Sequence, residues 1–220
     1  MWRERTGVKF PRVAVLIPVT SHGFRWKGIE EVPLIRFCLP SISQTAELGY
    51  DYAVYMGYDV GDLFFDNQQV LQQIKVHFET QIRNPNLQRG VEMQLAVLGF
   101  ENLLKKPGPV FNFLSSSAAL DGADYIYRIN DDTEFRTAWT SSYIRTLLSF
   151  KPPNVGVVGP TCREGNERIL THDFVHVTHL HIFGVHYPPV LMDWWMDDWI
   201  SSVYPAENFR KLRTVLVTHH

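Results

Sequence analysis

Uninterrupted apolar runs alternate with segments of helical spacing over residues 1–160, and this alternation restricts the chain to few folds. The first run, residues 13–19, is apolar throughout rather than at every second position, which is typical of a parallel strand covered on both faces. Further strands are expected over residues 52–58, 124–129 and 155–158. The sequence therefore predicts an α/β fold, a mostly parallel sheet flanked by helices.

Apolar residues at helical spacing predict the helices that connect these strands. They are expected over residues 32–48, 70–82, 110–120 and 141–150. Pro40 should kink or restart the first of them, because proline cannot donate its backbone hydrogen bond. Residues 84–109 show no clear period.

We expect one domain over residues 1–220, with a nucleotide-binding half at 1–160 and an irregular acceptor-side half at 161–220. The second half is rich in His and Trp and has no helical period, although residues 214–218 look like a strand. A chain of this length buries enough surface for a sizeable core. In such sheets, ligands bind at the carboxyl ends of the strands.

Charge and hydropathy exclude two classes of partner. A net charge of −2 argues against a nucleic-acid surface, which needs clustered Lys and Arg. No apolar run approaches the roughly 20 residues that span a bilayer, and the basic, polar residues 1–12 do not form a signal peptide. We therefore expect a soluble domain, cytoplasmic as it stands, or in the lumen of the secretory pathway if an anchor is missing.

The segment INDDT places Asn130, Asp131 and Asp132 directly after the expected strand 124–129. Adjacent carboxylates at the rim of a sheet repel each other unless a cation neutralises them. Oxygen ligands together with a phosphate-bearing substrate suit Mg²⁺ or Mn²⁺. A helix cap or a solvated turn is the alternative interpretation.

This arrangement resembles the DxD-type signature of GT-A-fold glycosyltransferases, and residues 110–132 are similar to the helix and strand preceding it in a little-characterised set of nucleotide-sugar transferases. The segment VLIPVTS resembles the first strand and nucleotide loop of that fold, while GVVGP and WWMDDWI look like its later elements. Two features depart from the pattern. Asn130 replaces the first Asp, and the chain stops at His220, earlier than the family leads us to expect, so a further C-terminal segment is expected.

The resemblance implies a nucleotide-sugar donor, in particular a UDP-sugar, and a divalent metal ion, Mn²⁺ or Mg²⁺. It implies that Asp132 binds the metal and that a C-terminal histidine, His219 or His220, completes the coordination. A frayed chain end is the alternative for these histidines. The residues implied in donor binding are Pro18, Thr20, Asp59, Asn130 and Asp131. For Asp59 and the nearby Asp62, a role in forming a turn is equally open.

The segment LMDWWMDDWISSVY suggests an acceptor site. Trp194 and Trp195 can stack on the apolar faces of a glycan or bind another hydroxyl acceptor. A carboxylate among indole rings is partly desolvated, which raises its pKa toward the range useful to a general base. By resemblance to inverting enzymes, Asp198 is the first candidate for that base and Asp197 the second. A surface turn with its Trp residues in the core is the alternative.

Residues 169–187 carry several histidines without a Cys pattern or an HExxH motif, so we expect hydrogen-bonded histidines lining the cleft rather than a zinc site. The Val, Thr and Phe content favours a strand there, with His179 and His181 on one side.

The sequence as a whole predicts a metal-dependent, hexosyltransferase-type glycosyltransferase that inverts the anomeric centre. A nucleotidyltransferase on a similar fold is one alternative. It is disfavoured because residues 19–28 lack a dense glycine pattern. A non-catalytic carbohydrate-binding or scaffold protein is another, since Asn130 replaces an acidic residue.

Overall fold

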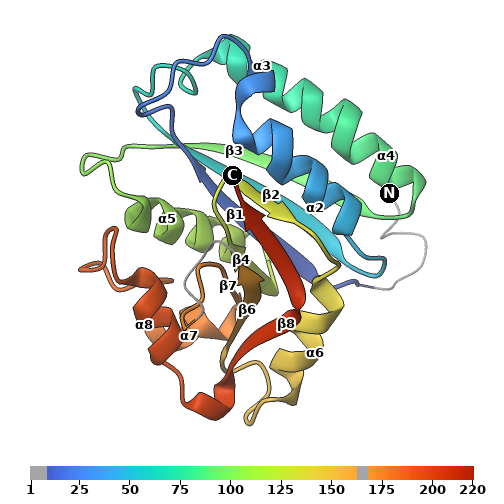
Figure 1. The fold of residues 1–220 in the computed structure, drawn as a ribbon, viewed down its shortest axis with the longest axis vertical. Coiled ribbons are helices and arrows are strands. Elements are labelled where there is room, and N and C mark those ends of the chain that lie inside the picture. Colours follow the sequence, from blue (N-terminus) through green and yellow to red (C-terminus); the bar gives the residue numbers. More distant parts are fainter. Residues whose placement is uncertain (1–8, 163–167) are drawn as a thin grey trace.

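A computed structural model of the protein describes residues 9–162 and 168–220. Residues 1–8 of the basic N-terminal segment 1–12 lie outside these ranges. Within them the centre of the molecule is an eight-stranded sheet (Figure 1). Its strands are β1 (Arg12–Val19), β2 (Asp51–Asp59), β3 (Glu92–Phe100), β4 (Tyr125–Arg128), β5 (Thr133–Phe135), β6 (Val157–Cys162), β7 (Asp173–His176) and β8 (Phe209–His219).

The sheet has the order β3-β2-β1-β4-β7-β6-β8-β5. Strands β3, β2, β1 and β4 run parallel, and β6 is also parallel to β8. Strand β7 is antiparallel to both of its neighbours, and β5 is antiparallel to β8. The expected α/β class, a mostly parallel sheet flanked by helices, is confirmed.

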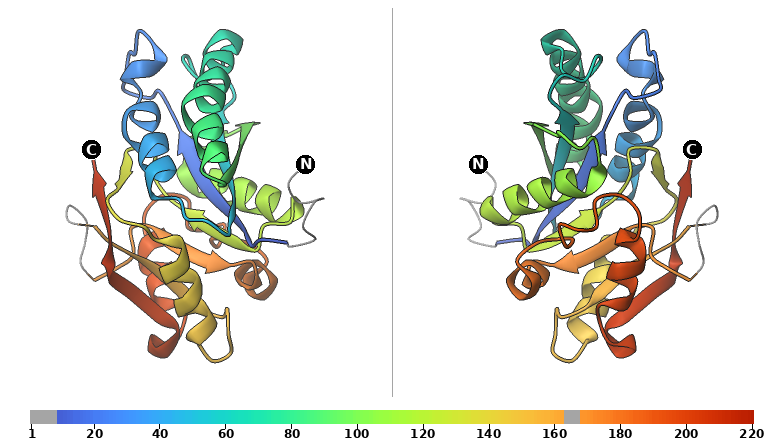
Figure 2. Two further views of the ribbon diagram at one scale, coloured as in Figure 1. Left: turned by 90° about the vertical axis from the view of Figure 1, so that its right-hand side faces the viewer. Right: turned by 90° about the vertical axis from the view of Figure 1, so that its left-hand side faces the viewer.

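The continuous apolar run of β1 follows from burial on both faces. Val13, Val15 and Ile17 belong to one core cluster, whereas Ala14 and Leu16 belong to the other. Helices with side chains in the first cluster are α2 (Leu39–Thr45), α3 (Gln68–His77) and α6 (Thr140–Ser149). Helices packed on the second are α5 (Pro107–Leu120), α7 (Thr178–Phe183) and α8 (Met196–Ser202). Figure 2 shows α2 and α5 on opposite sides of the sheet.

Two π-helical segments interrupt the α-helices of the first half. Segment η2 (Leu34–Cys38) leads into α2, and η3 (Phe78–Arg83) joins α3 to α4 (Asn84–Gln88). Pro40 occupies the first turn of α2, where its missing N–H is not needed. The predicted disturbance at Pro40 is therefore a restart of the helix. Two 3₁₀ turns, η1 (Ile29–Glu31) and η4 (Ala206–Asn208), complete the elements.

The structure adds elements where the sequence shows no period. Strand β3 lies within residues 84–109, and most of it is half-buried because it forms an edge of the sheet. The C-terminal region, expected to be irregular, contains β7, α7, α8 and β8 joined by loops. The predicted strand carrying His179 and His181 is wrong, since both residues lie on α7.

The sheet curls back on itself between β4 and β5. Only residues 129–132 separate these strands in the chain, yet β5 forms the far edge of the sheet. The N–H of Thr133 donates to the carbonyl of Asn130 at 3.3 Å, so this connection is a turn and not an extended bridge. The curl brings the end of β8 to the turn, where the N–H of His220 donates to the carbonyl of Asp132 at 3.2 Å.

Among the residues that the structure describes, no helix has both the length and the apolar character needed to cross a membrane.

Candidate active site

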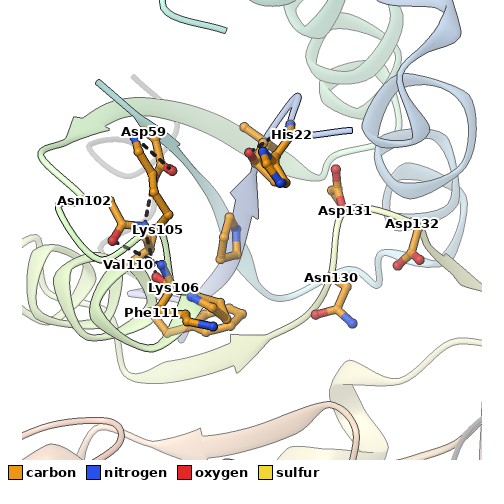
Figure 3. A pocket seen from close by; sticks show the side chains of 15 residues that line it. His22, Asp59, Asn102, Lys105, Lys106, Val110, Phe111, Asn130, Asp131 and Asp132 are labelled. Atoms are coloured by element: carbon orange, nitrogen blue, oxygen red, sulfur yellow. Dashed lines mark hydrogen bonds and ion pairs between the residues drawn. The ribbon is translucent and has the colours of Figure 1, made fainter. Parts of the chain in front are cut away.

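A cavity of about 550 Å³ opens at the carboxyl ends of β1, β2 and β4 (Figure 3). Parallel strands end at the same edge of a sheet, so residues that follow them in sequence meet there. All the predicted donor-binding residues and the predicted metal ligand Asp132 line this cavity. They are Pro18, Thr20, Asp59, Asn130, Asp131 and Asp132.

The carboxylate pair forms one wall. Burial, and then the charge of Asp132, raise the pKa of Asp131 to about 7. In Asp132 the Oδ1 atom is buried and has no hydrogen-bond partner within the described residues. A buried carboxylate oxygen without a partner is costly, and a cation would satisfy it. The carboxylate oxygens therefore fit Mg²⁺ or Mn²⁺ in their chemistry.

Cys38 lies beneath this turn, with its Sγ atom 4.0 Å from the carbonyl oxygen of Asn130. Burial, and then the charges of Asp131 and Asp132, hold the pKa of this thiol well above its usual value. A thiol that stays protonated is a poor nucleophile. Cys38 thus supports the turn by packing.

The opposite wall is basic and comes from the loop between β3 and α5. Figure 3 shows Lys105 and Lys106 on the side of the cavity away from Asp131. The loop is tied to β2 by Asn102, whose Nδ2 donates to Asp59 at 2.9 Å and to the carbonyl of Lys106 at 3.0 Å. The ammonium of Lys105 lies 3.7 Å from the other oxygen of Asp59. The amino end of helix α5 also lies at this wall of the cavity, and helix amino ends favour anions.

Sequence reasoning missed this basic wall. The signal was present as Lys105-Lys106-Pro107-Gly108, two cations immediately before a predicted helix, and helix amino ends attract phosphate. The sequence could not place this loop, because residues 84–109 show no period that would reveal strand β3 before it.

Two roles were open for Asp62, donor binding and formation of a turn, and its hydrogen bonds are those of a turn. Its carboxylate accepts hydrogen bonds from the N–H and hydroxyl of Ser21 at 2.8 and 2.7 Å, and from the N–H groups of Phe64 and Phe65 at 2.9 Å each. Burial alone would raise the pKa of Asp62, but these hydrogen bonds together lower it. Asp62 therefore fixes the loop after β1 against the loop after β2.

The predicted acceptor residues lie on a separate segment beside the basic wall. Trp194 and Trp195 are 80% and 70% exposed, so the alternative in which they are core residues is wrong. Their loop is held to α5 by two contacts. The N–H of Gly108 donates to the carbonyl of Met192 at 2.7 Å, and Lys106 pairs with Asp193 at 2.7 Å.

The two carboxylates of α8 have different surroundings. An oxygen of Asp197 accepts a hydrogen bond from Nη2 of the buried Arg128 at 2.7 Å. The neighbouring Asp198 is half-buried and, within the described ranges, its carboxylate has no hydrogen-bond partner. A carboxylate without such a partner remains available to accept a proton. Neither residue, nor Trp194 or Trp195, lines the cavity described above.

The C-terminal histidines end beside Asp132, but their side chains already have partners. The Nε2 atom of His219 lies 3.0 Å from Nε2 of His172. The ring of His220 stacks on Phe37 and lies 2.6 Å from an oxygen of Glu134. Over the described part of the chain, no three His, Cys, Asp or Glu side chains form a group that could hold a metal ion.

Of the five histidines in residues 169–187, His172, His176, His179 and His186 are hydrogen-bonded, as expected, but none of the five lines the cavity. His179 bonds with the hydroxyl of Tyr204 at 2.9 Å and with the carbonyl of His186 at 2.8 Å, and His186 pairs with Asp173 at 2.8 Å. They form a buried polar network between α7, β7 and the segment leading to α8.

No protein-family model and no curated protein sequence matches the chain. Solved structures do. A protein of Desulfovibrio desulfuricans G20 described as a nucleotide-diphospho-sugar transferase aligns with a TM-score of 0.55 at 12% identity, covering 94% of this chain and 81% of the other. S. aureus TarS residues 1–349, alone and in complex with UDP, aligns with a TM-score of 0.51 at 12% identity.

The alignment with TarS covers 94% of this chain, and the chain spans 60% of that TarS fragment. At such low identity the likeness concerns the fold. The cavity and the acidic turn both lie at the carboxyl ends of the parallel strands, where ligands bind in folds of this kind. This chain shares its fold with these two solved structures.

Proposed function

We propose that this protein is a metal-dependent glycosyltransferase that moves a hexose from a UDP-sugar to an acceptor hydroxyl with inversion. The observation that carries the proposal is the carboxylate pair Asp131–Asp132 at the cavity, with a basic wall opposite and a buried oxygen that has no hydrogen-bond partner among the described residues. The similarity to the UDP complex of TarS supports a uridine nucleotide as the donor.

The two walls suit the two parts of a nucleotide sugar. Pro18, Thr20 and Asp59 would contact the nucleoside, while Asn130 and Asp131 would hold the ribose or the sugar. Lys105 and the amino end of α5 would face the diphosphate, because both favour anions. Asp132, with Asp131, would hold Mn²⁺ or Mg²⁺, which when bound offsets the negative charge of the departing diphosphate.

The histidine part of the predicted metal site has less support. His219 and His220 could become ligands only by leaving His172 and Glu134. We propose that the carboxylates are the principal protein ligands and that donor phosphate oxygens supply others, an arrangement common for Mg²⁺.

Transfer requires a base for the acceptor. The acceptor oxygen forms a bond to the anomeric carbon, the bond from that carbon to the UDP oxygen breaks, and the acceptor proton passes to Asp198. Trp194 and Trp195 would stack on the acceptor. Asp198 suits this role better than Asp197, whose carboxylate is already paired with Arg128.

A thermal-shift and calorimetric titration with UDP, UDP-glucose and UDP-N-acetylglucosamine, with Mn²⁺ or with EDTA, tests the donor site. At 100 times its Kd a ligand stabilises the folded state by about 2.7 kcal/mol. We expect UDP to bind with Mn²⁺ and the shift to be lost in EDTA and in Asp132→Asn. Asp121→Asn is the matched control, because Asp121 caps the far end of α5.

Turnover separates the proposal from its alternatives. Release of UDP from a UDP-sugar supports a glycosyltransferase, whereas release of pyrophosphate from UTP would indicate a nucleotidyltransferase. Metal-dependent UDP binding without turnover in any acceptor panel would indicate a carbohydrate-binding or scaffold protein. Absence of any nucleotide binding by the intact chain would refute the donor site itself.

A further inference from the structure

Arg128 connects three parts of the structure that are distant in sequence. It is the last residue of β4, two positions before Asn130, and it is 4% exposed. Its Nη2 atom donates to Asp197 on α8 at 2.7 Å, and its Nη1 atom donates to the carbonyl of Thr171. Its guanidinium carbon lies 4.8 Å from the ring centre of Phe111, a residue that lines the cavity.

A second carboxylate near this cation, that of Asp173, has partners of its own. Asp173 is fully buried and accepts from the hydroxyl of Tyr187, and it pairs with His186 at 2.8 Å. Its nearest distance to the guanidinium is 3.9 Å, to Nε, which makes no hydrogen bond within the described residues. Asp197 is therefore the carboxylate that accepts a hydrogen bond from Arg128, while Asp173 is a second, more distant ion-pair partner. A buried charge that loses its partner is strongly destabilising.

The pair also ties the first turn of α8 to the end of β4. Helix α8 has 7 residues, too few to be stable alone in water. It follows Trp195, which has a left-handed backbone with φ of 74°. Asp197 lies in its first turn beside Asp198, so the bond to Arg128 holds the segment that carries both Asp198 and the exposed tryptophans.

We propose that Arg128 is a positioning residue that acts through Asp197, holding Asp198 at a fixed place relative to the Asp131–Asp132 turn. The inference rests on the proposed function, since it concerns the geometry between donor and base. It assigns different roles to the two adjacent carboxylates of α8: Asp197 orients the helix, and Asp198 takes the proton. Neither Arg128 nor Asp197 needs to touch the substrate.

The test compares Asp197→Asn, Arg128→Lys, Arg128→Met and the double variant Arg128→Met/Asp197→Asn, with Asp121→Asn as control. UDP affinity with Mn²⁺ is measured by calorimetry, and the rate of UDP release from UDP-glucose, UDP-galactose or UDP-N-acetylglucosamine is measured for the sugar that the intact protein uses. Hydrogen exchange of residues 188–202 reports on the segment itself. Asp197→Asn keeps the shape of the side chain but removes its negative charge, so the charge-assisted hydrogen bond from Arg128 is weakened.

We expect Asp197→Asn to lower the rate of UDP release by about ten- to a hundredfold, the effect of misplacing a reacting group by roughly 1 Å. UDP affinity should change by less than about threefold, because the cavity residues remain in place. Exchange over residues 196–202 should rise. The double variant should be no slower than Arg128→Met, because residues acting as a unit are not additive. Arg128→Lys should restore part of the rate lost in Arg128→Met.

Unchanged turnover in folded Asp197→Asn overturns the inference. So does a fall in UDP affinity as large as the fall in rate, since that indicates general damage rather than misplacement. Should Arg128→Met not fold, Asp197→Asn and Arg128→Lys decide the question. If the intact protein binds no UDP and releases none from these sugars, the proposed function fails, and the role of Arg128 fails with it. That result differs from the others because the unaltered chain already lacks activity.

Discussion

Replacing Gly108 with alanine should separate the tryptophan loop, residues 188–195, from the first turn of α5. A Cβ atom on Gly108 would lie 2.6 Å from the carbonyl oxygen of Leu191 and 2.8 Å from that of Met192. Both are backbone atoms, so no side-chain rotation can relieve the contact. The loop must move, and the 2.7 Å hydrogen bond from the N–H of Gly108 to Met192 is stretched or lost.

The expected loss of stability is the balance of three effects. Overpacking costs about 1–3 kcal/mol, and loss of the hydrogen bond costs about 1 kcal/mol. Alanine gains up to about 1 kcal/mol over glycine in a helix. The net loss of unfolding free energy is therefore roughly 1–3 kcal/mol. In a chain of this length a loss of ~2 kcal/mol lowers the Tm by roughly 4–8 °C.

Urea unfolding measures the free energy, and hydrogen exchange over residues 188–195 measures the loop. Ser116→Ala is the matched control, since Ser116 is an exposed residue of the same helix and its change should stay within about 0.5 kcal/mol. Equal stability of Gly108→Ala and the intact protein, with unchanged exchange in the loop, would refute the contact.

Three further changes have outcomes that the structure specifies. Gly156→Ala should cost more than about 3 kcal/mol, because Gly156 has φ of 149° and its Cβ would lie 2.3 Å from the carbonyl oxygen of Asn208; urea unfolding measures this. Burial lowers the pKa of His179 to about 4, so between pH 6.5 and 4 the unfolded chain binds a proton that the folded chain does not. Stability should fall as the pH drops through this window, by roughly 3 kcal/mol from His179, and His179→Gln should flatten the fall in a pH series of unfolding curves. Trp194→Ala and Trp195→Ala should each change stability by less than about 0.5 kcal/mol because the side chains are exposed, leave UDP affinity unchanged in calorimetry, and weaken transfer to oligosaccharide acceptors.

Each of these expectations has a contrary result. Gly156→Ala with native stability would contradict the close backbone approach. Parallel loss of stability at low pH in His179→Gln and the intact protein would assign the titration to other groups. A large drop in UDP affinity on replacing Trp194 or Trp195 would place these side chains at the donor instead of the acceptor.

Local patterns in the sequence were sufficient for the centre of the fold. Residues 13–19 are apolar at every position because β1 is covered on both faces, and such a run is visible without knowledge of any partner. The position of Asp131 and Asp132 at the cavity followed in the same way, since parallel strands end at one edge of the sheet. Strand β3 could not be found like this, because an edge strand is half-buried and lacks a clean apolar pattern.

Short elements depended on their surroundings. The Val, Thr and Phe content around His179 favours a strand, but these residues form the short helix α7, which packs on the second core cluster and ends at the left-handed Gly184. Tertiary packing overrides intrinsic preference where an element is too short to have a strong preference of its own.

The sequence by itself determined the α/β class and the placement of an acidic turn after a buried strand, because both depend on neighbours along the chain. Only the tertiary structure distinguished Asp197 from Asp198, set Lys105 opposite Asp131, and gave His219 and His220 partners near Asp132. These features depend on which charged groups lie close together in the folded chain. Arg128 and Asp197 are 69 positions apart in sequence, so no local pattern encodes their contact.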